Sequence, residues 1–291
     1  MEVLGMNEKL IELYNQIRKD NPEMSLDEVL IETYNQIKTY DVIKKYILEA
    51  NNIDEMTYYT KDVNPELKEF IRKKIFPIYK FNDLGHNLTH IIEVIRRSFA
   101  LNETFKLNLD HNMMYTIAAC HDWGKCENSD LHHEIAAAHF YETKEFKKYF
   151  NEEQRIIIKE AIEDHRSSKK EEPRSVYGKL ISSADRNTSI EIVFIRSFFV
   201  AHERTPEMQI DEYLDFTVNR LAKRYSLENP ENMHFEDRIY KNFLADMRDL
   251  LSRPDDFKNL YCEINGITSR NKKVEDFKGV TSYALKYTSI K

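Results

Sequence analysis

Histidine and aspartate residues in the middle of the chain occur at spacings that suit a metal site. His121 and Asp122 are adjacent at the inner end of a predicted helix, residues 111–125, whose buried face includes Met114 and Ala118. Burying a histidine and a carboxylate costs free energy unless the two groups are paired or bind a metal ion. Imidazole and carboxylate ligands suit Mn²⁺, Fe²⁺, Co²⁺, Ni²⁺ or Mg²⁺. The pair therefore indicates a divalent metal site.

Four other predicted helices repeat this pattern. Each places one histidine or aspartate on its apolar face, and a single residue of this kind is usually a satisfied core side chain. Five helices that each present one such residue inward are best explained by a shared ion. His132 points about 100° away from its neighbour on the helix and is expected in solvent. The four inward residues are His90 in 81–101, His133 in 131–140, His165 in 151–166 and Asp185 in 176–193.

The order of these residues resembles a known signature. The series His90, His121-Asp122 and Asp185 is similar to that of the HD-domain metal-dependent phosphohydrolases, and the resemblance covers roughly residues 62–262. It implies that these four residues hold one divalent ion and leave positions open for water. Such an ion lowers the pKa of bound water from about 15.7 toward about 7.

A second ion is implied by two further histidines. His133 and His165 resemble the additional histidines of members with a two-metal centre, such as the HD-GYP cyclic-dinucleotide phosphodiesterases, and the string HDWGK at 121–125 resembles their HD-x-G-K string. Asp122 is then the natural bridge between the two ions. No GYP tripeptide follows His165, which argues against cyclic di-GMP as the substrate.

Cationic residues beside the proposed ligands are candidates for binding substrate phosphate. Lys125, Arg166 and Arg186 each stand close in sequence to a ligand and would neutralise phosphate charge during the reaction. For Arg166 and Arg186, a role in salt bridges is an equal alternative to phosphate binding. His86, one turn before His90, would orient water or substrate, with a surface position as the alternative. The predicted catalytic residues are Asp122, Lys125 and Arg166.

Helices must position these side chains, because chain-breaking residues are scarce. Only six glycines and seven prolines occur in 291 residues, which favours long helices over a sandwich or barrel. We expect an all-α fold, an HD-like helical bundle around the metal centre. The predicted parts are an N-terminal helical hairpin (1–60), a phosphohydrolase domain (61–262) and a C-terminal tail (263–291).

Composition excludes several functional classes. The net charge of −7, from 43 basic and 50 acidic residues, argues against stable nucleic-acid binding. No window of about 18 apolar residues occurs, no signal-peptide-like start is present, and three cysteines are too few for a disulfide framework. We therefore expect a soluble cytoplasmic protein, with a homo-oligomer compatible with the sequence.

The expected activity is hydrolysis of a phosphomonoester or phosphodiester, with a nucleotide as the expected substrate. Two alternatives stay open. One is an HD-type di-iron oxygenase that acts on a small substrate with O₂. The other is a regulatory module that binds a nucleotide and metal without turnover.

Overall fold

Helices form nearly all the regular structure that is described. The computed structural model describes residues 15–24, 59–82, 86–166, 169, 171–227 and 234–277. Within those ranges no strand occurs, and the β-type pairing is an isolated bridge between Gln209 and Lys273. The predicted all-α fold is confirmed. The predicted N-terminal hairpin, 1–60, lies almost wholly outside the described residues.

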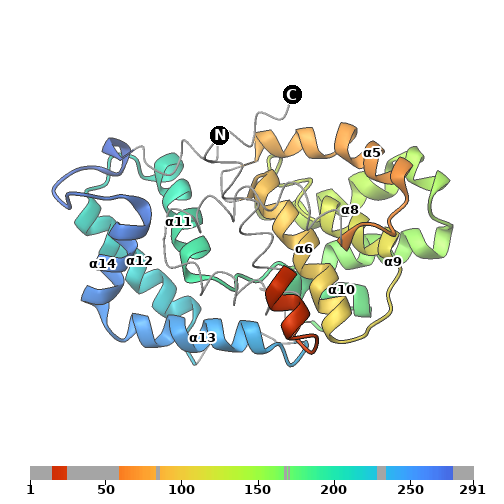
Figure 1. Cartoon of the computed structure of the whole chain (residues 1–291). Helices are drawn as coiled ribbons and strands as arrows, with labels where there is room; N and C mark the ends of the chain where they lie inside the picture. The colour runs from red at the N-terminus through yellow and green to blue at the C-terminus, as the bar shows by residue number, and fades with distance from the viewer. Residues whose placement is uncertain are drawn as a thin grey trace, which may run out of the picture.

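The helices follow one another with short connections, as Figure 1 shows. Two helices begin with asparagine caps: Asn64 caps α5, and Asn151 and Gln154 form a capping box on α9. The α-helices are α5 Pro65–Lys74, α6 Leu88–Thr104, α7 His111–Cys120, α8 His132–Glu142, α9 Glu152–Asp164, α10 Val176–Ala184, α11 Ile190–Arg204, α12 Ile210–Arg224, α13 Arg238–Leu251 and α14 Pro254–Asn265. The 3₁₀ helices are η1 Phe76–Phe81, η3 Lys144–Lys148 and η4 Val274–Asp276.

Helix α7 ends five residues before its predicted end at residue 125. The backbone turns tightly instead, with Trp123 N–H donating to the Cys120 carbonyl at 3.0 Å. This turn packs directly against α8, since a Cβ at Gly124 would lie 2.7 Å from the Cβ of Ile135. Only glycine permits such a close approach without displacing the neighbouring helix. The shorter helix places His121 and Asp122 at a bend, where both side chains face the bundle interior.

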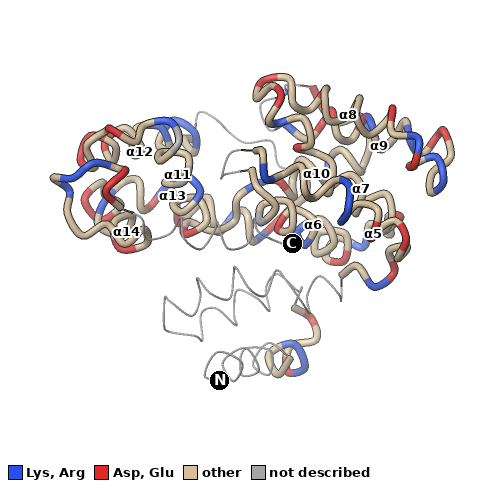
Figure 2. The backbone as a smooth tube through the Cα atoms, turned by 90° about the horizontal axis from the view of Figure 1, so that it is seen from above, with Lys and Arg blue, Asp and Glu red and all other residues tan. Residues whose placement is uncertain are grey.

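Two hydrophobic cores organise the described chain. The first is built from buried residues between Tyr59 and Ala184, on α5 to α10, and the second from residues between Val193 and Phe277, on α11 to α14 and η4. Figures 1 and 2 place these two sets of helices side by side. The predicted domain 61–262 thus contains nearly all of one core and most of the other, and its boundaries stay predictions.

Contacts at the start of α13 hold the second set of helices against the first. Arg97 of α6 forms a buried ion pair with Asp237, whose side chain also caps α13 by accepting from Ile239 N–H at 3.0 Å. Phe235, which precedes α13 in the chain, packs against the first core and stacks on Phe105 with ring centroids 5.2 Å apart. Because the carboxylate of Asp237 serves the ion pair and the cap together, the start of α13 is held against α6.

The second core contains a cluster of hydroxyl groups. Tyr261 OH lies 2.7 Å from Ser197 Oγ and 2.8 Å from Tyr213 OH, and Tyr213 OH donates to the Ser197 carbonyl at 2.9 Å. We call Ser197, Tyr213 and Tyr261 the hydroxyl cluster. Its three side chains come from α11, α12 and α14, so their hydrogen bonds connect the three helices.

The surface carries mixed charge. Figure 2 shows Lys and Arg interspersed with Asp and Glu along the helices of both cores. Among the described helices, none combines the length and the apolar character needed to cross a membrane.

Candidate metal centre

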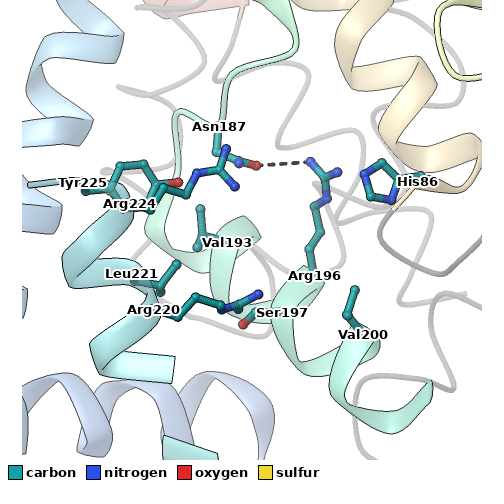
Figure 3. Close-up of a pocket in the computed structure, with 10 residues that line it drawn as sticks. All are labelled: His86, Asn187, Val193, Arg196, Ser197, Val200, Arg220, Leu221, Arg224 and Tyr225. Atoms are coloured by element: carbon teal, nitrogen blue, oxygen red, sulfur yellow. Dashed lines mark hydrogen bonds between the residues drawn. The ribbon is translucent and has the colours of Figure 1, made fainter. Parts of the chain in front are cut away.

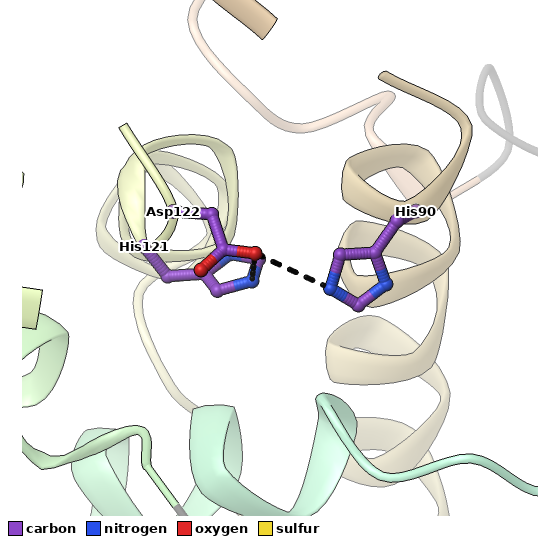
Figure 4. A group of neighbouring side chains, drawn as sticks. All are labelled: His90, His121 and Asp122. Atoms are coloured by element: carbon purple, nitrogen blue, oxygen red, sulfur yellow. Dashed lines mark ion pairs between the residues drawn. The ribbon is translucent and has the colours of Figure 1, made fainter. Parts of the chain in front are cut away.

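Four side chains from three regions of the first core form one group of potential metal ligands, which we call group 1. His90 comes from α6, His121 and Asp122 from the bend after α7, and Asp185 from the C-cap of α10. Asp122 Oδ2 lies 3.6 Å from His90 Nε2 and 3.4 Å from His121 Nε2 (Figure 4). Asp185 Oδ1 lies 3.0 Å from His90 Nε2 and 4.0 Å from His121 Nε2. The sequence predicted all four residues.

A second group, group 2, shares Asp122 with the first. Asp122 Oδ1 lies 3.3 Å from His132 Nε2 and 3.7 Å from His165 Nε2, and the two imidazole nitrogens are 3.1 Å apart. The two oxygens of the Asp122 carboxylate therefore face different ligand groups, Oδ2 toward group 1 and Oδ1 toward group 2. This arrangement agrees with the bridging position that the sequence analysis assigned to Asp122.

The second group contains His132 where the sequence predicted His133. The expectation that His132 lies in solvent is wrong, because this residue is only 5% exposed. His133 has its ring centroid 6.4 Å from that of His165 and its Nε2 3.8 Å from Glu134, so it stands beside group 2 without joining it. The reason is local: α8 begins at His132, whose Nδ1 donates to the Ser129 carbonyl and turns the ring inward.

Backbone hydrogen bonds set the tautomer of three of these histidines. Nδ1 of His121, His132 and His165 each lies 2.7–2.8 Å from the carbonyl oxygen three residues earlier. A carbonyl only accepts, so each ring carries a proton on Nδ1 and directs Nε2 into the site. Metal-binding histidines are held by the same kind of hydrogen bond. Two such Nε2 lone pairs at 3.1 Å repel each other unless a proton or a cation lies between them.

Burial and neighbouring charges shift the protonation of the site. Burial lowers the pKa of His90 and His132 to about 4 and that of His165 to about 3, so all three are neutral at pH 7. Burial also opposes protonation of His121, but the Asp122 carboxylate outweighs it and raises the pKa of His121 to about 9. Burial alone would raise the pKa of Asp122, yet the positive charge of His121 outweighs burial and holds the pKa of Asp122 well below its usual range.

These residues fit divalent metal ions. Nε2 of His90 and Nε2 of His121 are buried and have no hydrogen-bond partner, which normally costs free energy. Ligand atoms in octahedral coordination at about 2.1 Å stand about 3 to 4 Å apart. The separations in both groups, 3.0–4.0 Å, fall within that range. Metal binding would displace the proton of His121, because a ligating imidazole must be neutral.

The predicted cations lie at different distances from the centre. Lys125 is half-buried, and its charge adds to the effect of burial in lowering the pKa of His132, so it stands near group 2. Arg166 donates to the Asp130 carbonyl and lies near His133. The guanidinium of Arg186 lies over the ring of Tyr240, 5.7 Å from its centroid, toward the second core. Both arginines line one small pocket with Ser182 and His234.

His86 lies between group 1 and a larger cavity that the sequence analysis did not find. Its ring centroid is 5.8 Å from that of His90, and its side chain lines a cavity of about 250 Å³ (Figure 3). Three arginines line the same cavity: Arg196 of α11 and Arg220 and Arg224 of α12. We call it the arginine pocket. The four-residue spacing of Arg220 and Arg224 places both on one helix face, which is a weak indication of the pocket in the sequence. No pattern around Arg196 indicates that it joins them.

Comparison with known proteins identifies part of the chain. Residues 87–189 match the HD domain family. An uncharacterized protein of Clostridium beijerinckii is 32% identical over 107 residues, which cover 35% of this chain and 63% of that relative. The matched region therefore spans less than two thirds of the relative's length, and no solved structure matches the chain. Residues 87–189, the part of the chain that matches the HD domain family, carry every member of groups 1 and 2.

Proposed function

We propose that this protein hydrolyses a phosphomonoester or phosphodiester, with a nucleotide as the substrate class, at a centre of two divalent ions. The observation that carries the proposal is the position of Asp122, whose Oδ2 faces group 1 and whose Oδ1 faces group 2. A bridging carboxylate between two sets of imidazoles is the arrangement expected for a two-metal hydrolase.

The residues of the two groups would hold one ion each. His90, His121, Asp122 and Asp185 would hold the first ion, and His132 and His165 with Asp122 would hold the second. When bound, divalent ions lower the pKa of coordinated water and offset the negative charge of a phosphate group. The chain contributes preorganisation, because the Nδ1 hydrogen bonds to backbone carbonyls fix three of the rings before any ion arrives.

Lys125 is the cation best placed to assist. It follows the metal-binding bend directly, is half-buried and acts electrostatically on His132. A substrate phosphate beside group 2 would meet its ammonium group, which would stabilise negative charge that develops during the reaction. The guanidinium of Arg166 already donates to the Asp130 carbonyl, so its expected role is to hold the loop before α8.

The test combines metal analysis with a substrate panel. We expect two ions per chain by mass spectrometry and Mn²⁺-dependent hydrolysis of at least one member of a phosphate-ester panel. Asp122→Ala should remove most of the bound metal and nearly all hydrolysis while the helical circular dichroism stays intact. Asp130→Ala, which changes an exposed aspartate nearby, is the matched control. Full activity in a folded Asp122→Ala protein would refute the proposal.

A di-iron oxygenase is the second candidate, and the shared Asp122 carboxylate favours it equally, since a pair of iron ions fits the same ligands. Oxygen dependence separates the two activities. A hydrolase should turn over anaerobically with Mn²⁺, whereas an oxygenase needs both iron and O₂. Tight nucleotide binding without turnover under any of these conditions would indicate a regulatory module instead.

A further inference from the structure

The arginine pocket adjoins the metal centre, but its arginines come from outside the HD-domain match. Arg196, Arg220 and Arg224 all follow residue 189, where the match ends. His86 connects the two sites, because it lines the pocket while its ring centroid lies 5.8 Å from that of His90 in group 1. A single small molecule can therefore contact both places.

The charge of the pocket is strongly positive. Among the described residues, its lining includes three guanidinium groups and no carboxylate, in a chain whose net charge is −7. Arg196 Nη1 donates to Asn187 Oδ1 at 3.2 Å, which directs its guanidinium toward His86 in Figure 3. Arg220 and Arg224 stand one turn apart on α12 and are both exposed. The planar fork of a guanidinium matches the oxygens of a phosphate group.

The size of the pocket indicates a small ligand. Its volume, about 250 Å³, is close to the lower end of the range for small-molecule sites, ~300–1,000 Å³. Val193, Val200 and Leu221 supply an apolar wall beside the arginines. Charged groups that fix orientation and an apolar wall that contacts the rest of the ligand are typical of such sites.

We propose that the arginine pocket binds a second phosphate group of the substrate, so that the substrate is a small molecule phosphorylated at two positions. One phosphate would lie at the metal centre and the other among Arg196, Arg220 and Arg224. This inference rests on the proposed function, because that function places the reacting phosphate at groups 1 and 2.

The first experiment tests anion binding without the metal centre. Inorganic pyrophosphate is titrated calorimetrically into the full-length Asp122→Ala chain, or into the chelator-treated wild-type chain if that variant is unstable. Adding Arg196→Gln or Arg220→Gln should raise the Kd about tenfold each, since each removes a charged hydrogen-bond donor. Lys223→Gln is the control, because Lys223 is exposed on the same helix and does not line the pocket. Equal affinities in all variants, or no binding, would overturn the proposal.

The second experiment connects the pocket with the substrate. The Mn²⁺-loaded wild-type chain is assayed with pairs of esters that differ by one phosphate, such as AMP and adenosine 3′,5′-bisphosphate. The doubly phosphorylated member should have a KM about tenfold lower, and Arg196→Gln or Arg220→Gln should abolish this preference while kcat is kept. Pyrophosphate binding without such a preference would make the pocket a separate anion site and overturn the claim about the substrate. Hydrolysis of no ester at all would refute the proposed function, and the titration would still decide whether the pocket binds anions.

Discussion

The metal centre of the first core and the hydroxyl cluster of the second core both bury polar side chains from several helices. The two sites differ in the hydrogen bonds that these side chains make. In the hydroxyl cluster, Tyr261 OH contacts Ser197 Oγ and Tyr213 OH, so each hydroxyl has a protein partner. In the metal centre, the Nε2 atoms of His90 and His121 lie 3.0–4.0 Å from carboxylate oxygens but make no hydrogen bond. Folding normally pairs buried polar groups, because an unpaired one costs about 1–3 kcal/mol. The unpaired nitrogens thus mark a binding site, and the paired hydroxyls mark a structural contact.

The largest expected difference separates two adjacent histidines. His132→Ala should lower the metal content from two ions per chain toward one and remove most hydrolysis, since His132 Nε2 lies 3.3 Å from Asp122 Oδ1. His133→Ala should keep both ions, because its imidazole lies outside both groups. Mass spectrometry of the metal-loaded proteins measures the stoichiometry. Loss of an ion from the His133 variant alone would restore the ligand set predicted from the sequence.

Removal of the Lys125 charge should slow turnover without affecting metal content. We expect Lys125→Ala to lower kcat by about 10²–10³, the usual cost of losing one group that stabilises developing charge. Arg166→Ala, whose guanidinium is engaged by the Asp130 carbonyl, should have a smaller effect on kcat. Steady-state kinetics on the best ester of the panel compares the two. Equal kcat for Lys125→Ala and the wild type would remove Lys125 from the mechanism.

Asp164 is a buried carboxylate of the first core that, unlike Asp122, is fully paired. Arg174 donates to it from its backbone N–H at 2.8 Å and from its guanidinium, and Lys169 adds an ion pair. Burial alone would raise its pKa, but these partners hold the pKa below the ordinary 3.8. A lowered folded-state pKa stabilises the fold at neutral pH, and this contribution is lost as the pH falls below 3.8.

Replacing Asp164 tests this assignment. Asp164→Ala should destabilise the fold by about 1–3 kcal/mol at pH 7, because it removes the acceptor of the Arg174 backbone N–H and the partner of two cations that solvent partly screens. Denaturant titrations at several pH values measure the effect. The stability gap between variant and wild type should narrow as the pH falls below 3.8. A gap that is independent of pH would show that the ion pairs do not stabilise the fold.

The smallest effect is expected in the hydroxyl cluster. Tyr261→Phe removes one hydroxyl and keeps the buried ring, so it should cost about 1 kcal/mol of unfolding free energy. Metal content should not change, because the cluster lies in the second core, away from groups 1 and 2. Thermal unfolding and metal analysis of the same sample test both statements. A loss of metal in this variant would show that the two cores are coupled more tightly than their contacts indicate.

Local patterns in the sequence were sufficient to predict much of this protein. The scarcity of glycine and proline predicts helices, and the caps at Asn64 and Asn151 lie where their side-chain types indicate. The order of histidines and aspartates also predicts group 1, since each of these residues lies on the apolar side of its own element. Hydrophobic periodicity is a local property of the sequence, so it can be recognised without knowing how the helices pack.

The choice between His132 and His133 depended on tertiary structure. Both residues align with alanines of α8 at helical spacing, so periodicity alone does not separate them. The bend at residues 121–127, made possible by Gly124, brings the chain directly against the start of α8. That packing, together with the Ser129 carbonyl, decides which ring faces Asp122.

The arginine pocket could not be predicted from the sequence alone. Its charged residues come from α11 and α12, and its link to the metal centre, His86, precedes them by more than one hundred residues. Charged side chains on exposed helix faces resemble ordinary solvated residues, because their local pattern contains no information about which other helix stands opposite. The sequence by itself therefore determined the helices and the residue types of the candidate metal ligands, while helix packing alone decided which cations lie beside the candidate metal centre.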